Sequence, residues 1–258
     1  PLGLSPNAIK PAYGMAEAVV ALTSSPAGQR WRALHVQGQT LRSRGLVVLC
    51  EPDEPGAISL VSNGPPLDGV ELRVCDEGGV PMSEGRQGAI WVRGPSVARS
   101  YLHGEDTGSF VDGWYDTGDI GFVWQGELYV SGRAKDIVAR GGLKVGARDI
   151  EVVAEGELRL HSGRVAAFAS MDHAVGRERL ILVVARHYGV DEADVRRRIA
   201  EAVAGQCGLR VDEVCFVGNG TLPLTTSGKL RRAEVRERWE RGEYTIQSEG
   251  MEHDVQTV

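Results

Sequence analysis

The chain has 258 residues, a net charge of −6 and 42% hydrophobic residues, which fits a globular protein of one large or two modest domains. The net negative charge argues against broad nucleic-acid binding, which draws on excess positive charge. No apolar run approaches the ~20 residues that cross a bilayer, and residues 1–4 show no secretory signal. We therefore expect no nucleic-acid partner, no membrane insertion and a cytoplasmic location.

Cysteine and histidine usage argues against a metal cage and a disulfide framework. The four cysteines form no C-x-x-C pair, and the six histidines show no H-E-x-x-H spacing. Reduced thiols in a cytosolic protein are the expectation for such a pattern.

The first half of the chain predicts short strands. Residues 1–23 have the pattern of a loop, and residues 24–57 are irregular around one strand-like run at 46–49. From residue 58 to 130, short apolar runs alternate with turn signals. These predicted strands are 58–61, 70–74, 89–92, 121–123 and 127–130. Their close spacing predicts a small β-barrel or sandwich.

The second half mixes helices and strands. The clearest helix is 191–207, with apolar residues at helical spacing and Asp191 as its N-cap. A second helix is predicted at 149–160, with an acidic residue at its positive end, and a third at 231–241. The predicted strands are 137–139, 165–169, 180–185 and 214–217. The fold class is thus α+β, a barrel-like or sandwich-like part followed by a compact α+β domain, with a boundary near residues 132–136.

Three clusters carry residues suited to nucleotide chemistry. Residues 13–17 (Tyr-Gly-Met-Ala-Glu) combine an aromatic ring that can stack on a base, a glycine and a carboxylate able to hold Mg²⁺. Residues 114–121 place Asp119 on an expected tight turn, where it could accept hydrogen bonds from a diol or simply cap the turn. Residues 132–151 contain two lysines, and their alternative interpretation is a charged linker with a Gly-rich turn.

The fourth pattern is a loop around Lys229. Only four of the 29 basic residues are lysines, and this one lies in a Thr/Ser/Gly stretch within residues 222–232. Lysine is a compact point charge on a flexible stem, unlike the planar arginine fork. It suits delivery to a crowded anion, although an ordinary exposed lysine before a helix shares the pattern. A phosphate-loop motif is excluded because Pro223 and Leu230 occupy its Gly and Ser/Thr positions.

In this order and spacing, the clusters resemble the adenylate-forming superfamily, and within it the fatty acyl-AMP ligases. Residues 4–8, 91–98 and 126–130 are also similar to that family, and residues 24–57 resemble the insertion that distinguishes these ligases from CoA ligases. The resemblance extends to about residue 242.

The resemblance implies a reaction. A fatty or related carboxylic acid and ATP, with Mg²⁺, would give an acyl-adenylate, and the acyl group would pass to an acyl carrier protein in polyketide or lipopeptide biosynthesis. Lys229 would bridge the carboxylate and the α-phosphate as the catalytic lysine. The other implied roles are nucleotide binding by Tyr13, Gly14, Met15, Asp119, Arg133 and Lys144, a hinge at Lys135, and Mg²⁺ binding by Glu17.

One family element is missing from its expected place. The Ser/Thr/Gly-rich phosphate loop should precede Tyr13, whereas the similar composition at 23–28 follows it. The resemblance therefore implies the end of a large adenylation domain (1–131), a mobile small domain (132–242) and a flexible tail (243–258). We expect the chain alone to be inactive and a separate N-terminal half to be a partner. The alternatives are a non-catalytic docking module and a fragment of an acyl-CoA ligase.

Overall fold

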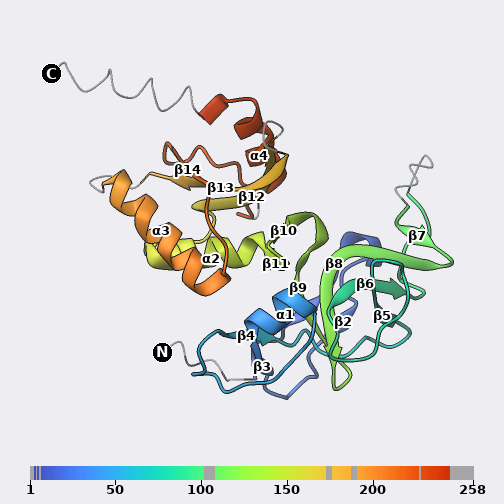
Figure 1. The fold of residues 1–258 in the computed structure, drawn as a ribbon. Coiled ribbons are helices and arrows are strands. Elements are labelled where there is room, and N and C mark those ends of the chain that lie inside the picture. Colours follow the sequence, from blue (N-terminus) through green and yellow to red (C-terminus); the bar gives the residue numbers. More distant parts are fainter. Residues whose placement is uncertain are drawn as a thin grey trace. The chain divides into compact units, whose positions relative to one another are not determined.

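The chain divides into two compact units, Pro1–Lys135 and Asp136–Val258. The structure is a computed structural model (Figure 1), and it describes residues 3, 5, 7–101, 108–172, 176–186, 191–226 and 228–244. Both units mix helices and strands, so the expected α+β class is confirmed. The boundary expected at 131/132 falls inside strand β9 (Glu127–Arg133), whose pairing with β8 extends to Arg133.

The first unit is built on an antiparallel five-stranded sheet. Its strands are β5 (Glu71–Cys75), β6 (Gly88–Arg93), β7 (Phe110–Val111), β8 (Trp114–Trp124) and β9. The order is β5-β6-β8-β7, and β9 also pairs with β8. Smaller elements flank this sheet. They are β1 (Ala12–Tyr13) paired with β2 (Thr23–Ser24), β3 (Ala33–Gln37) paired with β4 (Ala57–Val61), helix α1 (Gly38–Arg44) and the one-turn helix η1 (Ala16–Ala18).

Two apolar clusters form the core of this unit. One gathers Leu22, Ile90, Val92, Tyr115 and Leu128. The other gathers Val36, Leu41, Phe122 and Tyr129, and the rings of Phe122 and Tyr129 stack with centroids 5.1 Å apart. Apolar packing therefore holds the sheet that carries the candidate site in place.

Residues 24–57 contain more regular structure than their sequence predicts. Strand β3 and helix α1 lie in this segment, whereas the strand-like run at 46–49 forms only isolated bridges through Leu46 and Leu49. The helix is hard to recognise because it is short and begins Gly-Gln-Thr, without an apolar repeat.

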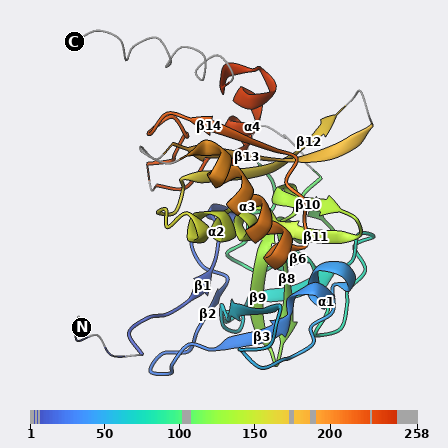
Figure 2. The ribbon, with the colours of Figure 1, turned by 60° about the vertical axis from the view of Figure 1, so that its left-hand side comes forward.

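The second unit is a three-layer arrangement around one sheet, visible in Figure 2. The sheet order is β12 (Val165–Asp172), β13 (Arg177–Ala185) and β14 (Glu213–Val217). β12 and β13 are antiparallel, while β13 and β14 are parallel. A hairpin of β10 (Ile137–Arg140) and β11 (Leu143–Gly146) precedes them, and a one-turn helix η3 (Ala134–Asp136) leads into that hairpin.

Both faces of this sheet are covered, because successive side chains of a strand point to opposite faces. Helices α2 (Ala147–Glu157) and α3 (Glu192–Cys207) pack with Leu180, Leu182 and Val184 in one cluster. Helix α4 (Arg232–Glu240) packs with Ile181 and Val183 in the other. This explains why β13 is a continuous apolar run in the sequence.

The predicted N-cap is confirmed. The carboxylate of Asp191 accepts a hydrogen bond from the backbone N–H of Ala193, at 3.0 Å, at the start of α3. Across the parts of the chain that the structure describes, no helix has the length and apolar character that crossing a membrane requires.

Candidate active site

Asp119 lies in the interior of β8, opposite Arg133 of β9, and the expectation of a tight turn at this position is wrong. The Asp-Thr-Gly-Asp sequence suggests a turn, but the strand continues through Gly118, which has a φ of 69°. The register of β8 against β9 shifts between Ile120 and Gly121. Such irregularities commonly redirect a side chain within a sheet.

Tyr13 and Arg133 both donate hydrogen bonds to the carboxylate of Asp119. Asp119 Oδ2 accepts a hydrogen bond from the Tyr13 hydroxyl at 2.6 Å, and Oδ1 accepts one from Arg133 Nε at 2.9 Å. The Asp119 side chain is only 10% exposed, whereas that of Arg133 is 64% exposed. Burial raises the pKa of the Tyr13 hydroxyl, and its hydrogen bond to Asp119 raises it further. Tyr13 therefore remains a donor, and Asp119 offers its remaining lone pairs to a ligand.

Glu17 belongs to a second group of side chains, on η1. Its Oε1 accepts a hydrogen bond from Tyr101 at 3.1 Å, and the hydroxyls of Tyr101 and Tyr115 are 2.9 Å apart. Burial, followed by the contact with Tyr101, raises the pKa of Tyr115. Tyr115 therefore stays a neutral hydrogen-bonding group, and Tyr101 lies between it and the Glu17 carboxylate.

Glu17 fits only one kind of metal site. No group of three or more His, Cys, Asp or Glu side chains able to hold a metal ion occurs among the described residues. Mg²⁺ is commonly bound by one or two carboxylates with substrate phosphates and water. A single Glu17 carboxylate fits that mode, with most ligands supplied by a nucleotide.

Gly14 and Met15, which are also predicted site residues, follow Tyr13 directly in the chain. A Cβ on Gly14 would lie 1.8 Å from the carbonyl oxygen of Val20, so only glycine fits there. Met15 packs against the Tyr115 core cluster. Both residues hold the Tyr13 segment in place.

Sequence reasoning missed the residues that support this group. Thr117 Oγ1 accepts a hydrogen bond from the backbone N–H of Asp119 at 3.1 Å and donates to the carbonyl oxygen of Ile90 at 2.8 Å. Tyr115, Thr117 and Asp119 alternate as buried positions along β8. This alternation is typical of a strand and was the available signal in the sequence. It was hidden because the segment has the composition of a turn.

Lys229 lies in the second unit, at the end of a small closed loop. The backbone N–H of Thr225 donates to the carbonyl oxygen of Lys229 at 2.7 Å, and that of Lys229 donates to Thr225 Oγ1 at 3.0 Å. Gly228 has a φ of 79° and donates to the carbonyl oxygen of Thr225 at 2.9 Å. The Lys229 side chain is exposed. Lys229 therefore presents an exposed cation from a backbone that is hydrogen-bonded to Thr225.

The two other lysines predicted for the site occupy other elements. Lys135 is exposed in η3 and is the last residue of the first unit. Lys144 is exposed in β11, opposite Ala139 of β10. The structure therefore brings Tyr13, Asp119 and Arg133 together and places Glu17 in a neighbouring element of that unit, whereas Lys144 and Lys229 belong to the second unit.

The comparisons with known proteins first identify a class. Residues 3–102 match the family described as AMP-binding enzyme. The chain is related to adenylate-forming ligases, and the resemblance predicted from its sequence is confirmed.

Two similar proteins bear the names of enzymes that activate acyl groups. A Caulobacter vibrioides protein whose name places it among the acyl-CoA synthetases is 35% identical over 95% of this chain and 43% of its own length. The long-chain-fatty-acid–AMP ligase FadD26 of Mycobacterium marinum is 31% identical over 93% of this chain and 44% of its own length.

Solved structures agree with these relatives. A structure from fatty acyl-adenylate ligases of E. coli and L. pneumophila is 27% identical, with a TM-score of 0.81, and the match covers 95% of this chain and 44% of that one. The structure of McyG A-PCP with phenylalanyl-adenylate is 25% identical, with a TM-score of 0.73, and covers 98% and 43%. The chain spans less than half the length of all these proteins.

Proposed function

We propose that this chain is part of a fatty acyl-AMP ligase, which activates a carboxylic acid with ATP to an acyl-adenylate. The observation that carries the proposal is the Asp119 site, a nearly buried carboxylate held by Tyr13 and flanked by the exposed Arg133. A ribose diol can donate to such a carboxylate, and a neighbouring guanidinium can donate to phosphate or ribose oxygens. The AMP-binding relatives support the same ligand.

The proposed chemistry requires two anions to approach each other. A carboxylate must attack the α-phosphate of ATP, and negative charge builds on the reacting phosphorus group as pyrophosphate leaves. Lys229 carries a compact cation on a backbone that is hydrogen-bonded to Thr225, which suits stabilisation of that charge. Lys144 would add a second cation near the phosphates, and Lys135 would be the hinge of a mobile small domain.

Tyr13 and Glu17 complete the proposed nucleotide contacts. The Tyr13 ring would stack on adenine while its hydroxyl holds Asp119. Mg²⁺ would bind between Glu17 and the phosphates, where it would neutralise part of their charge. Gly14 and Met15 would keep the Tyr13 segment in position.

The proposed acceptor is an acyl carrier protein, in polyketide or lipopeptide biosynthesis. One similar solved structure contains an A-PCP unit with a bound adenylate, which supports a carrier protein as partner. All four cysteines are thiols, which fits the reducing cytoplasmic compartment that we propose. Coenzyme A is the alternative acceptor, favoured by the Caulobacter relative named for CoA chemistry.

A second candidate function is a non-catalytic docking module. The observation that favours it is the similarity to the McyG A-PCP structure. ATP-dependent hydroxamate formation, measured with the chain alone and after adding an N-terminal half from a fatty acyl-AMP ligase, separates the two. We expect activity only in the mixture. Tight binding of a carrier protein with no hydroxamate in the mixture would instead support the docking module.

A further inference from the structure

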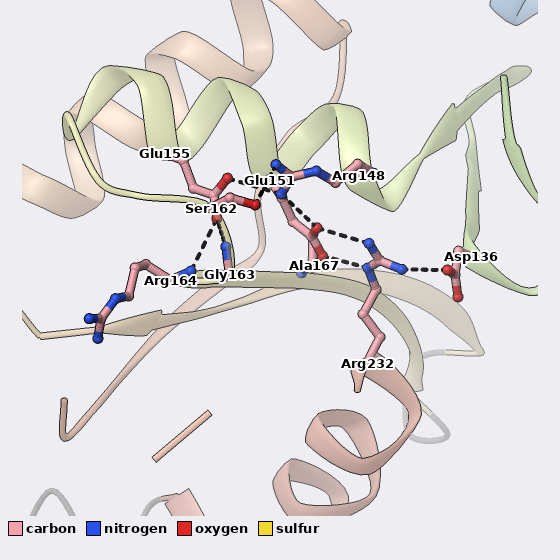
Figure 3. Close-up of polar contacts among 9 residues, drawn as sticks. All are labelled: Asp136, Arg148, Glu151, Glu155, Ser162, Gly163, Arg164, Ala167 and Arg232. Atoms are coloured by element: carbon pink, nitrogen blue, oxygen red, sulfur yellow. Dashed lines mark hydrogen bonds and ion pairs between the residues drawn. The ribbon is translucent and has the colours of Figure 1, made fainter. Parts of the chain in front are cut away.

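Arg232 joins three segments of the second unit (Figure 3). Its Nε donates to Glu151 Oε1 at 2.6 Å and its Nη2 to Glu151 Oε2 at 3.0 Å, while Nη1 bonds the carboxylate of Asp136. Arg232 is the first residue of α4, Glu151 projects from α2, and Asp136 is the first residue of the second unit. One guanidinium therefore connects α4 and α2 to the segment that enters the unit.

Burial makes this connection stiff. The Glu151 side chain is fully buried, and those of Arg232 and Asp136 are 20% and 27% exposed. Glu151 also accepts a hydrogen bond from the backbone N–H of Ala167 at 3.2 Å. A buried carboxylate is tolerated only when it is paired and hydrogen-bonded, and a bidentate Arg–carboxylate pair fixes both distance and orientation.

The Lys229 loop depends on the same anchor. Only two residues separate Lys229 from Arg232, and the backbone N–H of Arg231 donates to the carbonyl oxygen of Pro223 at 3.0 Å across the base of the loop. The N-cap residue of α4, Arg231, forms no side-chain cap hydrogen bond. The Arg232 clamp thus holds a helix start that lacks a cap, and with it the loop that ends there.

We propose that Arg232 is a positioning residue that couples Asp136, the first residue of the second unit, to the backbone hydrogen bonds around Lys229. A displacement of Asp136 releases one arm of the guanidinium and loosens the start of α4. The catalytic meaning of this coupling rests on the proposed function of Lys229. The coupling itself is a property of the second unit.

Hydrogen exchange of the backbone N–H groups of Gly228, Lys229 and Arg231 in the full chain tests the proposal. We expect Arg232→Lys and Asp136→Ala each to speed their exchange roughly tenfold, since a hydrogen bond between charged groups is lost. Exchange in β13 should not change. Arg236→Gln is the matched control, because this arginine of α4 forms an ion pair with Glu240 in which both side chains are exposed.

The outcomes are distinct. Unchanged loop exchange in a folded Arg232→Lys variant, or in Asp136→Ala, overturns the proposal. If Arg232→Lys unfolds because the buried Glu151 loses its bidentate partner, Asp136→Ala alone decides, since Asp136 is partly exposed.

A kinetic measurement separates this proposal from the function. In the chain completed with an N-terminal half, Asp136→Ala should lower kcat for adenylate formation with little change in the KM for ATP. Loss of kcat and a rise in KM by the same factor would point to a general structural defect. If the unmodified chain with its N-terminal half makes no adenylate, although the variants speed backbone hydrogen exchange near Lys229, the proposed function fails and the coupling stands.

Discussion

At Asp119, a nearly buried carboxylate accepts hydrogen bonds from one neutral and one charged neighbour. Its partner Arg133 is largely exposed, so neutralising Asp119 leaves no buried charge behind. The ligand, and not the fold, should therefore respond to a change at this position.

We predict that Asp119→Asn weakens AMP binding by about tenfold or more in the completed enzyme, because hydrogen bonds to a charged acceptor are lost. Titration calorimetry measures the affinity. Glu71→Gln is the control, since Glu71 forms an exposed ion pair with Arg93 in the same sheet, and it should bind normally. Equal affinity of Asp119→Asn and the unmodified protein would remove Asp119 from the site.

At the scale of single elements, strand β8 depends on glycine where other strands approach. A Cβ on Gly121 would lie 2.4 Å from the carbonyl oxygen of Tyr129 and 2.9 Å from Ile90 Cδ1. We predict that Gly121→Ala lowers the free energy of unfolding by about 1–3 kcal/mol through overpacking.

Gly205 in α3 has open space where a Cβ would lie, so Gly205→Ala should raise the free energy of unfolding by about 0.5–1 kcal/mol. Urea unfolding of both variants checks the two signs.

Asp212 links β10 to β13 through its carboxylate. Arg140 forms a two-point ion pair with this carboxylate, and the backbone N–H of Leu180 donates to it at 2.9 Å. Burial alone would raise the pKa of Asp212, but these hydrogen bonds prevail and hold it below its ordinary value.

The direction of the pH effect follows from linkage. A depressed folded-state pKa gives stability that is fully present above the ordinary Asp pKa of about 4 and is lost as the pH falls through the folded value. Asp212→Asn should lower stability at neutral pH and flatten the decline below about pH 4. Urea unfolding at several pH values measures this slope. An unchanged slope would mean that Asp212 does not contribute.

Much of the element plan could be predicted, because it depends on local periodicity. The apolar runs that became β4, β5 and β6, and the cap of α3, are signals carried by neighbouring residues. Helix α1 lacks an apolar repeat, and β8 has the composition of a turn. The clamp between Arg232 and Glu151 joins residues 81 positions apart, so no local pattern could reveal it.

For the whole molecule, the residues proposed to bind the nucleotide divide between the two units. Asp119 and Glu17, proposed for the ribose and Mg²⁺, belong to the first unit, and Lys144 and Lys229, proposed for the phosphates, belong to the second. Neither unit holds the complete proposed set. Each of the four buried core clusters draws on residues of one unit only. We therefore expect changes in either set to lower adenylate formation.

ATP–pyrophosphate exchange that depends on added carboxylic acid, catalysed by the chain completed with an N-terminal half, tests the proposed adenylation most directly. We predict that Lys229→Ala lowers the exchange rate by roughly 10²–10³, because one preorganised charge on the transition state is removed. Arg231→Ala, which removes an exposed charge two residues away, should exchange normally. Exchange by Lys229→Ala at the unmodified rate would contradict the account.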